Sequence, residues 1–256
     1  MEELVLETRH LKKIYNYHTD NEFEALHDIN FKVYRGEFIA VMGPSGSGKS
    51  TFINNISTID MYTSGHVYIN GHEIRTMSAN EIGTFRYKNL GFIFQDFNLL
   101  ESHTMYENIA MPLSLAHVSR DEIDRRIRDL AEKMDIVQLL KKYPYECSGG
   151  QRQRTAICRA LINNPHIIAA DEPTGNLDSK NSSELMKILV RLNRENGVTI
   201  VMVTHDPLIA SYSSRLIYIR DGNIESELRR EGRTQDEYFQ KIVEINSAES
   251  REILAE

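Results

Sequence analysis

The chain has 256 residues, 41% of them hydrophobic and 26% charged, proportions typical of one folded domain that buries a sizeable core. Its formal net charge of −7 argues against a general nucleic-acid-binding protein, which needs a basic face. The two cysteines, Cys147 and Cys158, belong to no CxxC or Cys/His cluster, so we expect neither a disulfide framework nor a metal site, and a reducing compartment is favoured.

Short apolar runs separated by turns predict strands in the N-terminal part of the chain. One of these runs leads directly into a segment rich in glycine and serine, after which a helix is predicted to begin near Ser50. Asn70 and Gly71 together are typical of a tight turn. The predicted strands are residues 4–15, 29–33, 38–42, 66–69 and 90–94.

The middle of the chain is helical in pattern. Residues 119–134 form a predicted helix, in which Ser119 and Glu122 predict a capping box at the start. A second helix is predicted over residues 151–163. The stripe that the first helix should turn toward the core consists of Ile123, Ile127, Leu130 and Met134.

Strand patterns return in the last third. Two continuous apolar runs predict strands that are buried on both faces, and a hairpin is predicted around Asp221-Gly222. Thr234 and Glu237 predict a capping box for a final helix with Tyr238, Ile242 and Ile245 on one side. Strands alternating with helices predict an α/β core with a helical insertion. The predicted elements are strands 167–170, 198–204, 215–219 and 222–226 and a helix over 182–193.

One segment fits the phosphate-loop pattern GxxxxGK[ST], with an apolar strand before it and a helix after it. Glycines let the backbone approach an anion closely, and the free N–H groups of the following helix favour phosphate. Lys49 is expected to reach the β- and γ-phosphates, and the Ser50 hydroxyl to bind Mg²⁺. The segment consists of Gly43, Pro44, Ser45, Gly46, Ser47, Gly48, Lys49 and Ser50.

A second strand, residues 167–170, ends in two acidic residues. Asp171 at its tip is placed to hold Mg²⁺ through the water shell of the ion, because Mg²⁺ prefers oxygen ligands. Glu172, one residue later, can polarise the water that attacks the γ-phosphate. A strand that ends in a solvated acidic turn is the simpler alternative, but a phosphate loop needs such a strand and the chain offers no comparable second one.

At this point the residues resemble a known family, the ATP-binding cassette (ABC) ATPases. The segment Cys147-Ser148-Gly149-Gly150-Gln151 looks like the LSGGQ signature of that family, with Cys in place of Leu. The resemblance covers nearly the whole chain and implies an α/β fold: a P-loop NTPase core with an antiparallel β subdomain and an inserted α-helical subdomain. It implies an ABC ATPase domain over residues 1–228, with the helical subdomain at approximately 97–165, and a C-terminal helical extension over 229–256.

The resemblance also implies roles for single residues. Tyr15 looks like the aromatic that stacks on adenine, although an ordinary, partly buried strand tyrosine remains an alternative; Asp178 looks like the D-loop acid. The implied catalytic residues are Lys49, Gln95, Glu172 and His205. The implied Mg²⁺ residues are Ser50, Gln95 and Asp171. The implied ATP-binding residues are Tyr15 and the segment Gly43, Pro44, Ser45, Gly46, Ser47, Gly48, Lys49, Ser50 and Thr51.

The implied cofactors are ATP and Mg²⁺, and two ATP molecules are implied to lie between two head-to-tail copies of the chain. The signature residues Ser148, Gly149, Gly150 and Gln151 then act on the ATP of the opposite copy. We therefore expect a chain that is mostly monomeric alone and dimerises with ATP when Glu172 is changed to Gln.

Residues 91–100 and 171–179 resemble the MacB/LolD/FtsE group. The segments that look closest to the BceA-type ATPases of bacitracin and lantibiotic resistance in bacteria are 155–157, 160–163, 178–181, 204–207, 210–215 and the tail around 238–239. This implies a separate integral-membrane permease, since no apolar stretch is long enough to span a bilayer and no signal peptide is evident. The expected location is the cytoplasmic face of the membrane. A sensor kinase, reached through the permease, is a further implied partner. Nucleic acid is not an implied partner.

Two other functions stay open. One is an ATPase like FtsE, LolD or MacB that drives cell division, lipoprotein release or macrolide-type mechanotransmission. The other is a soluble DNA-repair or translation ATPase, against which the net charge and the single uninterrupted cassette argue. We expect the permease to contact the region of Gln95 and residues 96–107, where Phe97 and Tyr106 either receive a helix of the permease or pack inside the lobe.

Overall fold

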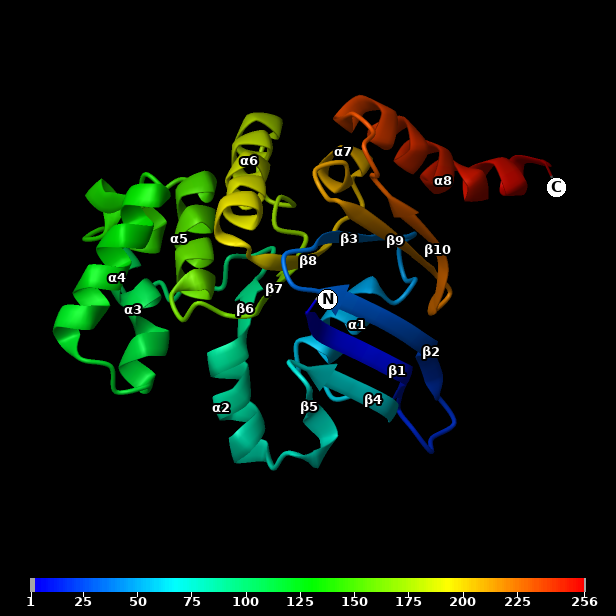
Figure 1. The fold of residues 1–256 in the computed structure, drawn as a ribbon, viewed down its shortest axis with the longest axis horizontal. Coiled ribbons are helices and arrows are strands. Elements are labelled where there is room, and N and C mark those ends of the chain that lie inside the picture. Colours follow the sequence, from blue (N-terminus) through cyan, green and yellow to red (C-terminus); the bar gives the residue numbers. More distant parts are fainter. Residues whose placement is uncertain (1–2, 256) are drawn as a thin grey trace.

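Two sheets organise the fold of the computed structural model, which describes residues 3–255 and the side chains of residues 3–247 (Figure 1). The smaller sheet is antiparallel, in the order β2-β1-β4-β5, and the larger sheet has the order β10-β9-β3-β8-β7-β6. The strands of the small sheet are β1 Leu4–Tyr15, β2 Phe23–Tyr34, β4 Ser64–Ile69 and β5 His72–Glu73. Those of the large sheet are β3 Phe38–Met42, β6 Leu90–Ile93, β7 Ile167–Asp171, β8 Thr199–Val203, β9 Arg215–Arg220 and β10 Asn223–Arg229.

The four strands β6, β7, β8 and β3 run parallel, and β9 joins β3 in the same direction. Every residue of β3 and β8 is buried, as expected for strands that are covered on both faces. Alternate residues of β3 separate two apolar clusters: Ala40 and Met42 belong to one, Ile39 and Val41 to the other. Because the strands are parallel, the segments that follow β3, β7 and β8 leave the sheet at one edge, which is where the predicted site residues lie.

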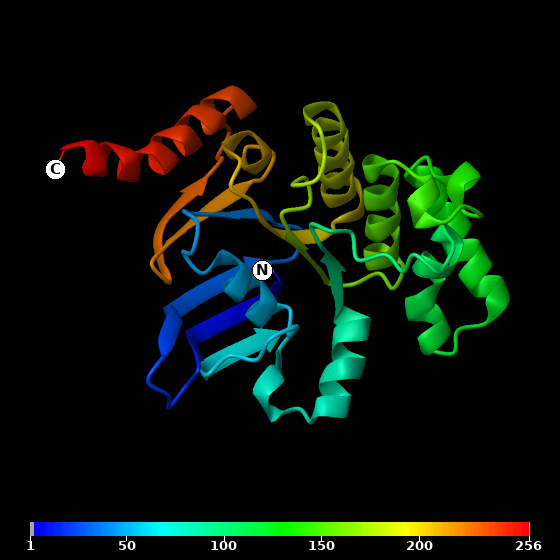
Figure 2. The same cartoon turned by 180° about the vertical axis from the view of Figure 1, so that it is seen from behind.

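Helices cover both faces of the large sheet. The helix α1 (Lys49–Ile56) packs on one face together with the antiparallel sheet. The helices α5 (Gly149–Leu161), α6 (Ser179–Asn196), α7 (Pro207–Ala210) and α8 (Gln235–Ala255) lie on the other. The lobe of α3 (Met105–Leu115), α4 (Arg120–Lys133) and α5 extends to one side of the large sheet, as both views show (Figures 1 and 2). The remaining helices are α2 (Ala79–Asn89) and the short turns η1 (Ile74–Thr76), η2 (Val137–Leu139) and η3 (Pro144–Glu146).

Of the two predicted capping boxes, one forms and the other does not. At α8 the capping box is confirmed, since the Glu237 carboxylate accepts from Thr234 N and the Thr234 Oγ1 accepts from Glu237 N. At α4 it is wrong: the Ser119 side chain makes no cap hydrogen bond. The carboxylate of Glu122 is instead held by the guanidinium groups of Arg125 and Arg126.

The C-terminal helix α8 packs against the molecule through its first turns. Tyr238 and Ile242 are fully buried, Ile245 packs against the same cluster, and the Tyr238 hydroxyl donates to the Leu228 carbonyl. Beyond these turns the ribbon runs away from the rest of the molecule (Figures 1 and 2). Among the helices of residues 3–255, none has both the length and the apolar character needed to cross a membrane.

Candidate nucleotide site

The phosphate loop connects β3 to α1 and depends on two glycines. Gly43 has a φ of 151°, and a Cβ there would lie 1.9 Å from the Ile219 carbonyl oxygen. Gly48 has a φ of 100°, and its Cβ would lie 2.6 Å from the Ala25 carbonyl oxygen. A side chain fits at neither position, so the close approach of this backbone to its neighbours requires glycine.

The start of α1 is open to an anion. Its cap residue, Gly48, supplies no side-chain hydrogen bond, and the first turn holds no acidic residue. The first N–H groups of the helix therefore lack a side-chain acceptor, and the helix dipole favours negative charge there. Lys49 folds back over the loop, with Nζ donating to the Pro44 carbonyl at 2.6 Å. Burial lowers the pKa of Lys49, while the carboxylates of Glu172 and Asp171 oppose that shift.

Asp171 ends β7 and carries a buried carboxylate oxygen, Oδ1, without a hydrogen-bond partner within the described chain. Burial raises the pKa of Asp171, as does the charge of Glu172, while Ser50 and Lys49 lower it. A buried, unpartnered carboxylate oxygen next to a serine hydroxyl is the donor chemistry that Mg²⁺ prefers. These residues therefore fit the ion. No cluster of three or more His, Cys, Asp or Glu side chains suited to another metal occurs within residues 3–255.

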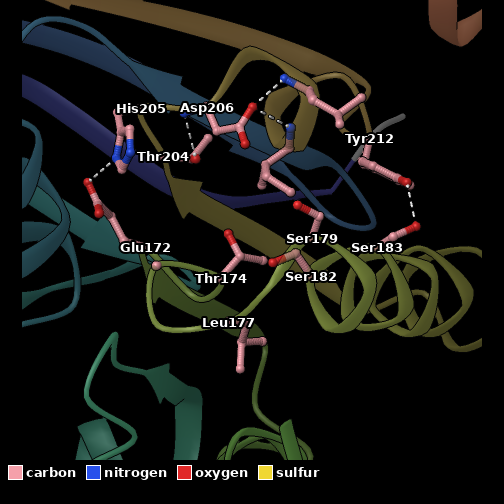
Figure 3. Close-up of a pocket in the computed structure, with 13 residues that line it drawn as sticks. Glu172, Thr174, Leu177, Ser179, Ser182, Ser183, Thr204, His205, Asp206 and Tyr212 are labelled. Atoms are coloured by element: carbon pink, nitrogen blue, oxygen red, sulfur yellow. Dashed lines mark hydrogen bonds and ion pairs between the residues drawn. The ribbon is translucent and has the colours of Figure 1, made fainter. Parts of the chain in front are cut away.

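Glu172 and His205 meet at the same edge of the sheet (Figure 3). Glu172 has a φ of 43°, and its N–H donates to the Val203 carbonyl of β8. The Nδ1 of His205 lies 3.0 Å from the Oε1 of Glu172. The His205 side chain is 69% exposed, so its ring is open to a ligand on the far side. Both residues line a cavity of about 280 Å³.

Gln95 follows β6 and lies beside the segment after Glu172. A Cβ on Gly175 would approach the Gln95 Nε2 to 2.9 Å, so the two residues are in close contact. The Asn176 side chain donates to the Gln95 carbonyl at 3.1 Å and to the Asp96 carboxylate at 2.8 Å. The contact that Asn176 makes was not predictable from the sequence, because it joins segments about eighty residues apart.

Tyr15 lies at the end of β1, next to α1. Its hydroxyl donates to the Asp60 carboxylate at 3.1 Å and lies 3.4 Å from the Thr51 hydroxyl. The Lys13 ammonium sits 4.7 Å from the ring centroid, in cation–π range. The side chain is 37% exposed. Tyr15 is thus anchored beside the phosphate loop with part of its ring accessible.

The signature segment starts α5. Ser148 caps the helix: its hydroxyl accepts from Gln151 N, and the Gln151 side chain accepts from Ser148 N. A Cβ on Gly150 would lie 2.9 Å from the Asn181 Oδ1. Burial raises the pKa of the Cys147 thiol, so the residue that replaces leucine packs as a neutral side chain.

Asp178 caps α6, because its carboxylate accepts from Asn181 N at 2.9 Å and from the Asn181 side chain at 2.6 Å. Signature and D-loop are therefore neighbours. In the part of the chain that the structure describes, however, no hydrogen bond joins the signature to the phosphate loop. The phosphate loop, Gln95, Asp171, Glu172 and His205 gather at one sheet edge, and the signature does not complete their site within one copy.

Comparisons with known proteins agree with this geometry. The chain matches the ABC transporter family over residues 26–175. It is 46% identical over 243 residues to the ABC transporter ATP-binding protein YxdL of Bacillus subtilis, and the match covers 95% of this chain and 93% of that protein. It is 44% identical over 239 residues to the bacitracin export ATP-binding protein BceA of Halalkalibacterium halodurans, covering 93% of this chain and 94% of that protein.

Among solved structures, the ATP-binding cassette MJ0796 of Methanocaldococcus jannaschii, in a dimeric post-hydrolysis state with ADP and phosphate, matches with a TM-score of 0.81. The identity is 38%, and the match covers 88% of this chain and 98% of that chain. The expected fold, a P-loop NTPase core with an antiparallel β subdomain and helices, is confirmed, as are the likeness to the MacB and BceA-type proteins and the activity of ATP hydrolysis. The chain belongs to the ABC transporter ATP-binding family and is an ATP-binding and ATP-hydrolysing subunit of an ABC transporter.

Proposed function

We propose that this subunit powers a separate membrane permease and hydrolyses ATP only between two head-to-tail copies of itself. The observation that carries the proposal is the division of the site. The start of α1 is open to an anion at one place, and the signature start of α5 lies beside α6 at another. Each copy thus supplies one half of a site that a second copy completes. The solved structure of the cassette MJ0796 is dimeric, which supports a site that two copies share.

Within each half-site, the N–H groups of α1 and Lys49 bind the β- and γ-phosphates. When bound, Mg²⁺ neutralises charge between these phosphates, and Ser50, Asp171 and Gln95 are the residues that would hold it. Glu172 accepts a proton from the attacking water, whose oxygen bonds to the γ-phosphorus while the bond to ADP breaks. His205 orients Glu172 through Nδ1 and contacts the γ-phosphate with its other ring nitrogen.

Sizing by light scattering tests the divided site. The Glu172→Gln chain should double its mass with ATP and stay monomeric without it, because ATP binds but does not turn over. A chain that also carries Lys49→Ala should stay monomeric in both conditions. If the mass of the Glu172→Gln chain does not rise with ATP, the head-to-tail arrangement is wrong.

The permease is proposed to dock in a groove of about 410 Å³ next to β6 and the N-terminal end of the lobe. Apolar side chains line much of it, and Leu115 is 73% exposed. Arg86 and Arg159 lie at its wall, so the groove suits a short permease helix with an apolar face and an acidic residue. The apolar lining residues include Ile59, Phe92, Phe94, Met111, Pro112 and Leu115.

The two aromatics that were candidates either to receive this helix or to pack inside the lobe both make contacts within the chain. Phe97 is 6% exposed, with the Arg152 guanidinium over its ring. The Tyr106 hydroxyl hydrogen-bonds to Asp124 of α4, and burial raises the pKa of Tyr106 to about 12. These contacts support packing inside the lobe for both residues.

We propose that the transporter confers resistance to peptide antibiotics of the bacitracin or lantibiotic kind. The permease then lies in the membrane, and this subunit lies on the cytoplasmic face of the membrane. The likeness to a bacitracin export protein supports this, and signalling through the permease to a sensor kinase would accompany it. The test is to purify the chain from native membranes with its permease and measure ATP hydrolysis. Stimulation by bacitracin or a lantibiotic supports the proposal. Stimulation by a macrolide or a lipoprotein alone would instead favour a MacB- or LolD-like function.

A further inference from the structure

The segment after β6 holds an unusual backbone. Phe97 and Asn98 have φ values of 62° and 48°, in the left-handed region that non-glycine residues rarely adopt. Two consecutive residues in this region need neighbours that fix them. The structure supplies one such neighbour from α5: the Arg159 guanidinium donates through Nη2 to the Phe97 carbonyl at 2.7 Å and through Nη1 to the Asn98 carbonyl.

Arg159 has no other charged partner among the residues that the structure describes. No carboxylate lies within ion-pair distance of it, and burial lowers its pKa. Its charge is therefore stabilised mainly by the two carbonyl dipoles, so both contacts should be strong. A planar fork can reach two carbonyls at once, which a lysine ammonium on one stem cannot do with the same geometry. Arg159 and Asn98 both line the groove next to β6.

The other side of the segment touches the ATP half-sites. Asn176 donates to the Gln95 carbonyl and to the Asp96 carboxylate. The Phe97 ring lies under the Arg152 guanidinium, 5.1 Å from its centre, and a Cβ on Gly149 would be 3.9 Å from the Phe97 Cζ. Residues 95–98 thus connect the groove to Gln95 on one side and to the start of the signature helix on the other.

We propose that Arg159 is a positioning residue that makes residues 95–98 one rigid unit, so that a partner in the groove moves Gln95 and the signature helix together. The coupling part of this inference rests on the proposed docking of a permease in the groove. The anchoring part does not, since it concerns contacts within one copy. Because Gln95 serves the ATP of its own copy and the signature serves that of the second copy, one event in the groove would reach both ATP sites.

The anchor can be tested on the full-length isolated chain by hydrogen exchange. Phe97 N and Asn98 N are hydrogen-bonded within the segment, and Arg152 N is bonded in the first turn of α5, so all three amides report on its order. With Arg159→Lys we expect exchange to rise about tenfold at 97–98 and also at 151–152, since a hydrogen bond from a charged donor stabilises a structure by an amount that changes its opening about tenfold. The matched control is Arg191→Lys, which removes a guanidinium-to-carbonyl contact between α6 and α4 at 3.1 Å, away from this segment.

Faster exchange at both places in Arg159→Lys, and at neither place in Arg191→Lys, supports the inference. Unchanged exchange at 97–98, or a rise there without one at 151–152, overturns it. If Arg159→Lys lowers the melting temperature strongly, Phe97→Leu tests the same connection: exchange at 151–152 should rise while the Arg159 contacts remain, and no rise would overturn the inference.

A second readout uses ATP-dependent dimerisation in the Glu172→Gln background. Adding Arg159→Lys should raise the dimer dissociation constant about tenfold, because the signature start is less ordered, and Arg191→Lys should leave it unchanged. An equal dissociation constant with Arg159→Lys would overturn the connection to the signature. If the Glu172→Gln chain itself does not dimerise, the proposed function fails, whereas the exchange experiment still decides the role of Arg159.

Discussion

The Nδ1 of His205 lies 3.0 Å from the Oε1 of Glu172, and the two residues follow adjacent parallel strands, β8 and β7. The backbone fixes Glu172 in place, because its N–H donates to the Val203 carbonyl at the end of β8. A carboxylate held in this way can take a proton from water without moving, and the exposed histidine orients it. The first two predictions concern the chemistry at this edge of the sheet.

Glu172→Gln should keep ATP binding and lose hydrolysis by about 10²- to 10⁴-fold, because a positioned general base contributes a factor of that size. His205→Ala should lose about as much, because His205 is proposed both to orient Glu172 and to contact the γ-phosphate. Steady-state hydrolysis with a fluorescent-nucleotide binding assay on the same samples measures both. Full hydrolysis by the Glu172→Gln chain would remove Glu172 from the mechanism.

Asp171→Asn should abolish Mg²⁺-dependent hydrolysis and yet stabilise the free chain by about 1 kcal/mol, since it removes the charge of a half-buried carboxylate whose Oδ1 has no hydrogen-bond partner in the described part of the chain. The substitution is expected to stabilise the chain because the pKa of Asp171 is raised in the folded state. The folded chain keeps this proton to higher pH than the unfolded chain does, so its contribution to stability falls as the pH rises from the ordinary aspartate pKa through the raised one.

Thermal unfolding from pH 4 to pH 8, without nucleotide or Mg²⁺, measures this contribution. The free energy of unfolding of Asp171→Asn should exceed that of the natural chain by an amount that increases with pH across that window. This difference should shrink when Mg²⁺ and ATP are added. A gain that does not depend on pH would mean that the carboxylate at 171 is not the destabilising group.

Tyr15→Ala should weaken ATP binding by about tenfold or more, because stacking of a base on an aromatic ring contributes about 1–3 kcal/mol. Tyr15→Phe keeps the ring and loses only the hydrogen bond from the hydroxyl to Asp60, so it should bind ATP nearly as well as the natural chain. Isothermal titration with ATP compares the two. Equal losses in both variants would mean that the hydroxyl anchor matters, and not the ring face.

Leu115→Asp should prevent co-purification with the permease, since it places a charge on the most exposed apolar side chain of the groove. The control is Val137→Asp, and ATP hydrolysis is measured for both isolated variants. Normal hydrolysis shows that a variant is folded, so a loss of co-purification then reports on docking. Val137 is also an exposed apolar residue, at 44%, but it lies outside the groove. Permease capture that is normal with Leu115→Asp would move the docking surface elsewhere.

Much of the core was predictable because its signals are local. The strands β3, β7 and β8 are continuous apolar runs, and the phosphate loop is a fixed pattern of glycines between a strand and a helix. The first half of β2 was missed: the strand begins at Phe23 and not at residue 29. Its N-terminal half, FEALHD, does not alternate regularly and is held by pairing with β1. Pairing with a strand that is distant in the sequence does not show in the local alternation of apolar and polar residues.

The helices α2 and α3 were not predicted. No residue of α2 is fully buried, and its apolar side consists mainly of Ile82 and Phe85, which is too short a stripe to stand out in the sequence. The helix α3 has Pro112 inside it. Both nevertheless begin with capping boxes, Ser78 with Glu81 and Thr104 with Glu107, which were readable in the sequence. The box that was predicted at Ser119 does not form, because nearby arginines compete for the glutamate.

Within the site, residue types and their positions on strand ends were predictable, but the contacts that hold them were not. Asp178 caps α6, Asn176 holds the carbonyl of Gln95, and Arg159 holds residues 97–98. Each contact joins chain segments whose approach depends on the packed tertiary structure. The roles in ATP hydrolysis stay predictions that the variants above test.

The most direct test of the divided site mixes two inactive chains. Lys49→Ala removes the phosphate contact and leaves the signature; Gly150→Asp places a negative charge at the signature and leaves the phosphate loop. Aspartate in the first turn suits a helix start, so the second variant should fold. Random pairing makes half of the dimers mixed, and each mixed dimer has one intact site out of two. We therefore predict that the mixture recovers about a quarter of the natural ATPase activity. A mixture no more active than its two components would contradict a site built from two copies.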